Sequence, residues 1–209
     1  MISNHSRYVA IGNVRVWKHT DLLGFTVPYV DEIFSYYAEK TYNKAYNYFK
    51  EQEIEDMEKF GYTLSDKVLD AKAKNRAEKT TIREIEQGYQ AFETKLNTIN
   101  NSLAQTPFVT ISFGLKTDKW ARIISQVILK TRKKGLGQHK TTAVFPKLVF
   151  LYKSDINGDK NSPNYDIKKL AIQCSATRSY PHYLSVEPGT DQYEYYQECG
   201  KAVSPMGKC

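Results

Sequence analysis

The sequence lacks the long apolar run that a membrane-spanning helix requires. Its longest apolar runs, such as residues 148–152, are only a few residues long, whereas a spanning helix needs about 20. The first residues also contain no apolar stretch of the signal-peptide type. We therefore expect a cytoplasmic chain that does not enter a membrane.

Several motifs with well-defined chemistry are missing as well. The three cysteines form no Cys-x-x-Cys pair, and the four histidines do not have zinc-ligand spacing. The sequence contains no P-loop, no complete Gly-x-Gly-x-x-Gly and no Gly-x-Ser-x-Gly. The residues alone therefore predict no metal and no cofactor in this chain. We interpret Cys174 as a buried structural thiol and Cys199 as an incidental residue of a polar loop.

The composition is that of an ordinary globular domain, but its charge is unevenly distributed. The chain has 209 residues, of which 41% are hydrophobic and 25% charged. Residues 105–209 hold 16 basic and 8 acidic side chains, whereas residues 28–104 hold 11 and 14. A basic half is typical of proteins that bind nucleic acid, nucleotide phosphates or an acidic partner, and also of a merely well-solvated lysine-rich surface. Both interpretations stay open.

Residues 28–104 predict a helical hairpin. Apolar residues recur at three- and four-residue spacing over 28–60 and again over 82–99, which gives each helix one apolar face. Pro28 suits a first helical turn, Gly61 ends the first pattern, and Ser65 is a candidate N-cap for a helix that runs to about residue 103. Such apolar faces are more typical of core or dimer packing than of a ligand site.

The second half predicts a β-α-β-α-β unit. Strands are expected over 107–113, 143–151 and 183–186, with helices over 120–132 and 165–175 and a polar loop over 155–163. Pro146 should mark a bulge or an unpaired position in the second strand. This alternation favours an α/β fold with a parallel sheet. Residues 1–27 are irregular, with two short strands expected around Gly12-Asn13.

A basic cluster lies at the C-terminal end of the helix predicted over 120–132. It consists of Lys130, Arg132, Lys133 and Lys134. Cations at this end of a helix complement the helix dipole. The cluster is also suited to a phosphate contact, and the sequence leaves both interpretations open.

A series of short sequence words follows in fixed order through the second half. They are Gln105–Gly114, Ile128–Lys130, Gly135–Gly137, Phe145–Val149, Pro163–Ala171, Tyr180-Pro181 and Ser204–Gly207. In kind, order and spacing these words resemble the anaerobic (class III) ribonucleoside-triphosphate reductases. Pro28-Tyr29-Val30 is similar to the start of that family's helical segment.

The resemblance implies a fold and a division of the chain. The family fold is a ten-stranded α/β barrel, so residues 105–209 are expected to form an incomplete part of it that ends at the active-site loop. Residues 28–104 are expected to be a dimer and effector region, and residues 1–27 remain unmatched. The family enzymes are about three times as long, so we expect an internal fragment, or one product of a split enzyme, that is inactive alone.

The resemblance also implies a radical chemistry. In the family, a glycyl radical generates a thiyl radical on a loop cysteine, which abstracts the ribose 3′ hydrogen, and formate supplies the reduction. The glycyl radical and a zinc site are expected in the missing C-terminal part, and ATP or deoxynucleotide effectors in the full enzyme. The expected partners are the remainder of the reductase, a radical-SAM activating enzyme, a second copy of the chain, and a ribonucleoside triphosphate substrate.

Cys209 is the candidate here for the family's loop cysteine. It directly follows a Pro-Met-Gly sequence in the family, whereas here Ser204, Pro205, Met206 and Gly207 are followed by Lys208 and then by Cys209. Either Cys209 is the thiyl cysteine displaced by one inserted residue, or the chain leaves the family pattern at Lys208. The alternative function, from a different class, is a basic nucleic-acid-binding module.

Overall fold

A four-stranded parallel sheet organises the protein. The computed structural model describes residues 24–98 and 108–202. In spatial order, which is also chain order, the strands are β1 Gly24–Val27, β2 Phe108–Phe113, β3 Lys147–Tyr152 and β4 His182–Ser185. Each neighbouring pair is parallel. The predicted α/β class with a parallel sheet is therefore confirmed.

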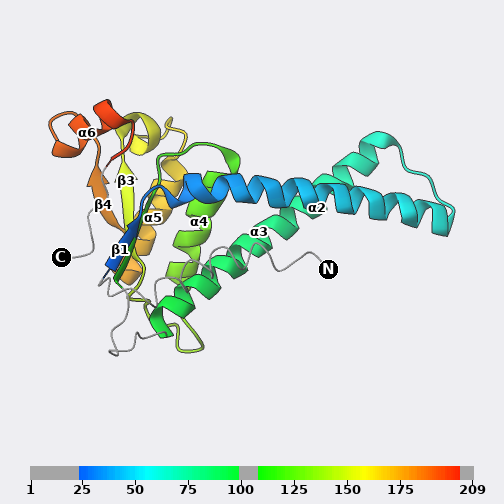
Figure 1. The fold of residues 1–209 in the computed structure, drawn as a ribbon, viewed down its shortest axis with the longest axis horizontal. Coiled ribbons are helices and arrows are strands. Elements are labelled where there is room, and N and C mark those ends of the chain that lie inside the picture. The colour runs from blue at the N-terminus through cyan, green and yellow to red at the C-terminus, as the bar shows by residue number, and fades with distance from the viewer. Residues whose placement is uncertain (1–23, 99–107, 203–209) are drawn as a thin grey trace.

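Helices connect successive strands and cover one face of the sheet. The hairpin of α2 (Val30–Phe60) and α3 (Asp66–Thr98) leads from β1 to β2 and extends far beyond the sheet (Figure 1). α4 (Lys119–Lys134) leads from β2 to β3. A π-helical turn (Ser154–Gly158) and α5 (Tyr165–Arg178) lead from β3 to β4, and α6 (Asp191–Cys199) follows β4.

The two faces of the sheet are buried in different ways. The odd-numbered residues of β2 and the even-numbered residues of β3 pack against α3, α4 and α5, as alternation along a strand requires. Their neighbours Val149 and Leu151 point to the other face and pack with Leu115, Val186 and Ala202. The helix-covered face holds the main core, and the second face holds a smaller cluster near the ends of the strands.

Local sequence signals fix the ends of the helices. Gly61 ends α2 in the left-handed region (φ 67°), where glycine is unstrained. Ser65 occupies the position before α3, and its carbonyl accepts a hydrogen bond from the Leu69 amide (3.0 Å). Asp118 caps α4, because its side chain accepts hydrogen bonds from the amides of Trp120 and Ala121 (3.1 and 3.0 Å). The predicted hairpin is confirmed, with α2 starting at Val30 rather than at Pro28.

A buried ion pair ties the hairpin to α4. Arg132 and Glu93 are both 0% exposed, and Arg132 Nε lies 2.6 Å from Glu93 Oε1. Arg132 Nη2 also donates to the Pro146 carbonyl (2.6 Å), which brings the start of β3 into the same contact. Burial raises the pKa of Glu93, and the guanidinium opposes that shift. Arg132 is therefore a buried member of the basic cluster in the last turn of α4, and it is not accessible for the phosphate contact that the sequence left open.

Several predicted boundaries need correction. β3 begins at Lys147, after Pro146, so the predicted strand over 143–151 is too long. The physical reason is Asn97 of α3, whose Oδ1 accepts hydrogen bonds from the amides of Val144 and Phe145 (2.9 and 3.1 Å). These amides are satisfied without a neighbouring strand. Residues 66–98 form one continuous helix, as expected for the second helix of the hairpin.

The sequence predicted neither β1 nor α6. β1 lies at the end of the segment expected to be irregular, while the strands expected at 8–11 and 14–17 lie outside the described residues. Cys199 ends α6 and does not lie in a loop; acidic Asp191 and Glu194 in the first turn of α6 favour that helix. Within 24–98 and 108–202, no helix is both long and apolar enough to cross a membrane.

Glu93→Ala tests the buried ion pair. We expect it to lower the free energy of unfolding by about 3–5 kcal/mol, because it leaves Arg132 buried without its counter-charge. Glu78→Ala is the matched control, since it removes another α3 glutamate paired with a cation of α4, Lys119, at the surface (2.8 Å). Its expected cost is below about 1 kcal/mol. Urea unfolding followed by circular dichroism measures both values, and equal costs would contradict this account of the pair.

Candidate active site at the carboxyl edge of the sheet

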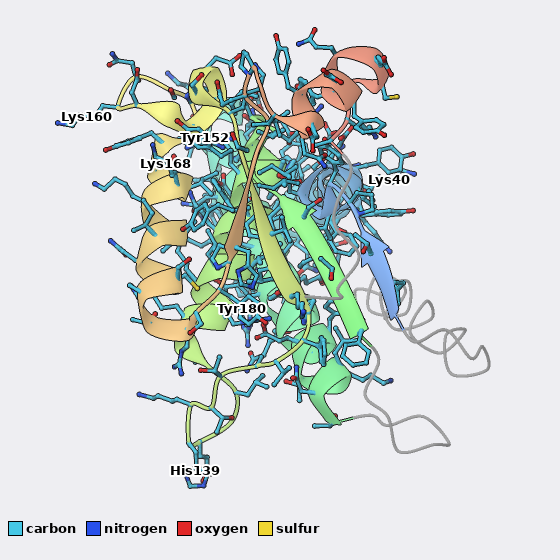
Figure 2. All side chains as sticks on the ribbon, turned by 90° about the vertical axis from the view of Figure 1, so that its left-hand side faces the viewer. Lys40, His139, Tyr152, Lys160, Lys168 and Tyr180 are labelled. Carbon is cyan, nitrogen blue, oxygen red and sulfur yellow. The ribbon has the colours of Figure 1, made fainter. Side chains whose placement is uncertain are left out.

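The carboxyl ends of the four strands meet at one edge of the sheet. In open α/β sheets ligands bind at this edge. Here it is formed by Tyr29 after β1, Gly114 after β2, Asn157 after β3 and Val186 after β4. The same edge carries the π-helical turn and α6, at the upper end of Figure 2, where Tyr152 marks the end of β3.

Gly114 is the hub of the edge. Its amide donates to Asp31 Oδ2 (2.9 Å), and its carbonyl accepts from the side-chain amides of Asn157 (3.2 Å) and Asn164 (3.1 Å). Its φ is 118°, and a Cβ at this position would lie 2.8 Å from the Phe150 ring. Only glycine fits this backbone conformation and this close approach. The backbone amide and carbonyl of this one residue thereby join the starts of α2 and α5 to the end of β2 and the turn after β3.

Asp31 is a buried carboxylate in the first turn of α2. It is 0% exposed. Its Oδ2 also accepts from Ser125 Oγ (3.2 Å), and its Oδ1 accepts from the Glu32 amide (3.1 Å). These donors are all neutral. Burial raises the pKa of Asp31 to about 6, and the hydrogen bond from Gly114 is the largest opposing effect.

Two asparagines fix the loops around Gly114. Asn157 also donates to the Leu151 carbonyl (2.9 Å) and accepts from the Lys153 amide (3.1 Å). Asn164 donates to the Lys116 carbonyl (3.0 Å), and its Oδ1 accepts from Arg122 Nη1 (2.7 Å). Most of their hydrogen-bonding capacity is used within the protein. The loops are therefore held in place by the protein's own contacts.

Ala202 is the last residue that the structure describes, and it lies at this edge. Ala202 is 4% exposed and belongs to the small apolar cluster on the second face of the sheet. Its amide donates to the hydroxyl of Tyr29, whose own amide donates to Ser112 Oγ (3.1 Å). The last described residue before the predicted active-site loop is thus fixed beside the ends of β1 and β2.

The structure describes only some of the residues singled out in the sequence analysis. Ser204, Pro205, Met206, Gly207 and Cys209 lie outside the described residues, so their predicted roles stay predictions.

Cys174 is confirmed as a buried thiol on α5, and burial raises its pKa to about 11. Cys199 is exposed. Among residues 24–98 and 108–202, no three His, Cys, Asp or Glu side chains gather as a metal site would require.

The hydrogen-bond network around Gly114 was missed by the sequence interpretation. A signal for it was present, since Gly114 directly follows a buried strand, and Asn157 and Asn164 lie in the polar stretch after the next one. Polar residues directly after buried parallel strands meet at one edge of the sheet. Asp31 carried no such signal, because it lies at the start of a helix.

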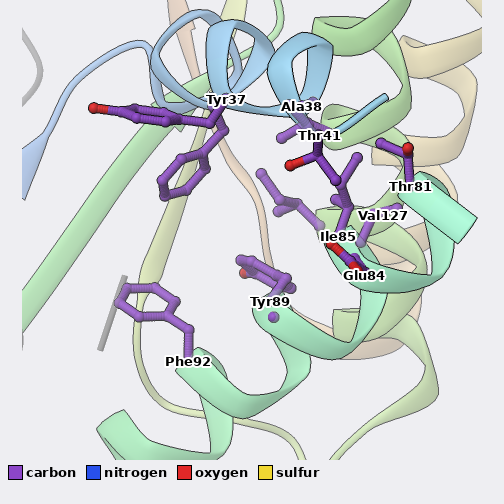
Figure 3. Close-up of a pocket in the computed structure, with 13 residues that line it drawn as sticks. Tyr37, Ala38, Thr41, Thr81, Glu84, Ile85, Tyr89, Phe92 and Val127 are labelled. Carbon is purple, nitrogen blue, oxygen red and sulfur yellow. The ribbon is translucent and has the colours of Figure 1, made fainter. Parts of the chain in front are cut away.

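Away from this edge, a cavity lies between the hairpin and α4. It is an apolar cavity of about 140 Å³ lined by residues of all three helices, among them Tyr37 and Ala38 of α2, Ile85 and Tyr89 of α3, and Val127 of α4 (Figure 3). Glu84 Oε2 and the Tyr89 hydroxyl are buried without a hydrogen-bond partner. The cavity is suited to an apolar group.

Comparison with known proteins gives a family match. Residues 23–208 match the family model for anaerobic ribonucleoside-triphosphate reductases. The chain belongs to that family.

Three curated relatives carry the name anaerobic ribonucleoside-triphosphate reductase. Over 184 residues the chain is 41% identical to the protein of Enterobacteria phage T4 and 36% identical to those of Haemophilus influenzae and Escherichia coli. Each match covers 88% of this chain but only 27%, 23% and 23% of the respective relative. The chain spans about a quarter of the length of these relatives.

Asp31→Asn tests the buried carboxyl. Because the pKa of folded Asp31, about 6, lies above its ordinary value of 3.8, ionisation favours the unfolded chain. The stability contributed by protonated Asp31 is present at low pH and is lost as the pH rises through about 6. Relative to Asp31→Asn, the wild type should therefore lose up to about 1.4 kcal/mol of unfolding free energy per pH unit between these values.

Urea unfolding across this pH range makes the measurement. Asp70→Asn is the control, because its bonds to Lys74 and Tyr46 lower the pKa of Asp70. Above its ordinary pKa of 3.8, Asp70 is ionised in both the folded and the unfolded chain, so the difference between wild type and Asp70→Asn should stay nearly constant over this range. A difference between wild type and Asp31→Asn that does not vary with pH would contradict the assignment.

Proposed function

We propose that this chain is part of an anaerobic reductase that converts ribonucleoside triphosphates to deoxyribonucleotides in the cytoplasm. The observation that carries the proposal is the family match across residues 23–208. It is supported by the position of Ala202, which brings the chain to the carboxyl edge of the sheet directly before Ser204. The buried, hydrogen-bonded side chains of Asp31, Asn157 and Asn164 at this edge suit a reaction that must be kept from solvent.

The proposed chemistry places Cys209 against the ribose. Its thiyl radical takes the 3′ hydrogen, and the 2′ hydroxyl leaves as water with a proton. Formate supplies two electrons, with a second cysteine taking part, and is oxidised to carbon dioxide. The 3′ hydrogen then returns from the thiol, which restores the thiyl radical. The glycyl radical that starts the cycle, and the zinc site, would belong to another part of the reductase.

The proposed barrel extends the described sheet on both sides. Spatial order equals chain order in β1 to β4, as it does in a barrel that grows by one strand per crossover. Closure to ten strands would pair the outer edges of β1 and β4 and so remove unpaired backbone groups. We propose that the remainder of the reductase chain, or a split partner, supplies these strands.

The hairpin is the proposed dimer and effector region. Ile33 and Tyr37 of α2 are 44% and 45% exposed, and Tyr37 also lines the apolar cavity. Exposed apolar residues beside a cavity favour contact with another protein surface. A second copy of the chain would cover them, with ATP or deoxynucleotide effectors bound in the same region. The radical-SAM activating enzyme would act elsewhere on the reductase.

Cys209→Ala tests the proposed thiyl cysteine. In a complex reconstituted anaerobically from this chain, the rest of the reductase, the activating enzyme and formate, we expect deoxynucleotide formation to fall to background. Cys199→Ala is the control and should retain full activity, since Cys199 is exposed at the end of α6. The isolated chain should form no deoxynucleotide. Full activity of Cys209→Ala would refute the assignment, and salt-sensitive binding of DNA would support the nucleic-acid-binding alternative.

Tyr37→Glu tests the proposed dimer surface. A charge placed beside the apolar cavity should shift the oligomer towards monomer, because association would bury that charge without a partner. Ile172→Glu is the matched control, since Ile172 is a similarly exposed apolar residue on α5, away from the hairpin. Light scattering after size-exclusion chromatography measures the mass of each variant. An unchanged dimer in Tyr37→Glu, or a monomeric wild type, would argue against this surface.

A further inference from the structure

We infer that Tyr29 is the positioning residue for the segment that begins at residue 203; this inference rests on the proposed function. The first observation is its backbone. Tyr29 has φ 50° and ψ 45°, in the left-handed region, immediately before α2. A bulky side chain is strained there, whereas glycine or asparagine would be relaxed. Such strain persists only where the surroundings hold the residue firmly.

Tyr29 is held at both of its ends. Its amide donates to Ser112 Oγ (3.1 Å), in a buried contact with β2. Its hydroxyl accepts a hydrogen bond from the amide of Ala202, a residue 173 positions further along the chain. The side chain makes no capping hydrogen bond to α2. Starting the helix therefore does not explain a tyrosine here, whereas the reach of its hydroxyl to Ala202 does.

Neighbouring contacts seat the same short stretch on the start of α2. Lys201 Nζ lies 5.5 Å from the centre of the Tyr29 ring and 3.9 Å from Glu32 Oε2. Ala202 and Tyr29 are 4% and 6% exposed and share one apolar cluster. Residues 201 and 202 are thus fixed by a hydrogen bond, a cation–π contact, an ion pair and burial. Tyr29 takes part in all of these except the ion pair.

The position of this anchor gives it a role in the proposed reaction. The thiol of Cys209 must come within van der Waals reach of the ribose 3′ hydrogen, and a misplacement of about 1 Å costs roughly a hundredfold in rate. The chain leaves the described edge at Ala202, seven positions before Cys209. Tyr29 touches neither the substrate nor the reacting sulfur in this account. It acts by fixing the point from which the loop starts.

Tyr29→Phe removes the hydroxyl and keeps the ring and its packing. The amide of Ala202 should then exchange its hydrogen about tenfold faster, because it loses its hydrogen-bond acceptor. Tyr46→Phe is the matched control, since it also deletes a tyrosine hydroxyl with a single partner, Asp70 (2.7 Å), but in the hairpin. It should leave Ala202 unchanged. Hydrogen exchange by mass spectrometry or nuclear magnetic resonance measures this on the chain itself.

The kinetic test uses the reconstituted reductase. In Tyr29→Phe we expect kcat to fall about 10- to 100-fold, while KM for the ribonucleotide and the glycyl-radical signal in electron paramagnetic resonance stay unchanged. A merely structural defect would raise KM and would lower the radical yield, kcat and protein stability together. Tyr46→Phe should retain the wild-type kcat.

The outcomes separate this inference from the proposed function. Unchanged exchange at Ala202 in Tyr29→Phe would overturn the anchor. Faster exchange with an unchanged kcat would overturn its role in positioning. If the wild-type complex itself forms no deoxynucleotide, the proposed function is contradicted, and exchange at Ala202 still decides whether Tyr29 is the anchor.

Discussion

The backbone amide and carbonyl of Gly114 make the contacts on which the carboxyl edge of the sheet depends. Its amide satisfies the buried carboxylate of Asp31, and its carbonyl is shared by Asn157 and Asn164. These partners come from the starts of two helices and from the turn after β3, so a shift of Gly114 would displace all of them. Buried polar groups are costly when they lose a partner, which makes such a hub rigid. A radical reaction benefits from this rigidity, because its reacting atoms must stay aligned and dry.

A second buried polar contact, between Arg132 and Glu93, fastens the helical hairpin to the sheet. It joins α3, α4 and the residue before β3, and both side chains are fully buried. The hairpin is therefore attached to the α/β unit through two buried charged groups. Removing one of them would leave the other charge buried without its partner, at a cost of about 3–5 kcal/mol. This pair is one of several connections between the hairpin and the sheet, beside the hydrogen bonds of Asp31 with Gly114 and of Asn97 with Val144 and Phe145.

The sequence predicted the architecture better than the site. Buried strands and helix ends have strong local signals, such as the β-branched run of β2 and the glycine after α2, and these elements were located correctly. The start of β3 was misjudged, because Asn97 satisfies the amides before it through a contact 47 residues away. Arg132 looked like a surface cation, since nothing local reveals that Glu93 lies opposite. Tyr29 and Asp31 were not recognised as site residues for the same reason, because their partners come from distant strands and loops.

In the proposed reductase, the carboxyl edge of this sheet carries the loop that performs ribonucleotide reduction. The most direct measurement is an anaerobic structure of the chain assembled with the rest of the reductase and a bound ribonucleoside triphosphate. We expect the ribose to lie over this edge, with its C3′ about 4 Å from the sulfur of Cys209, near van der Waals contact. A ribose bound at the amino ends of the strands, or far from Cys209 while the complex is active, would contradict it.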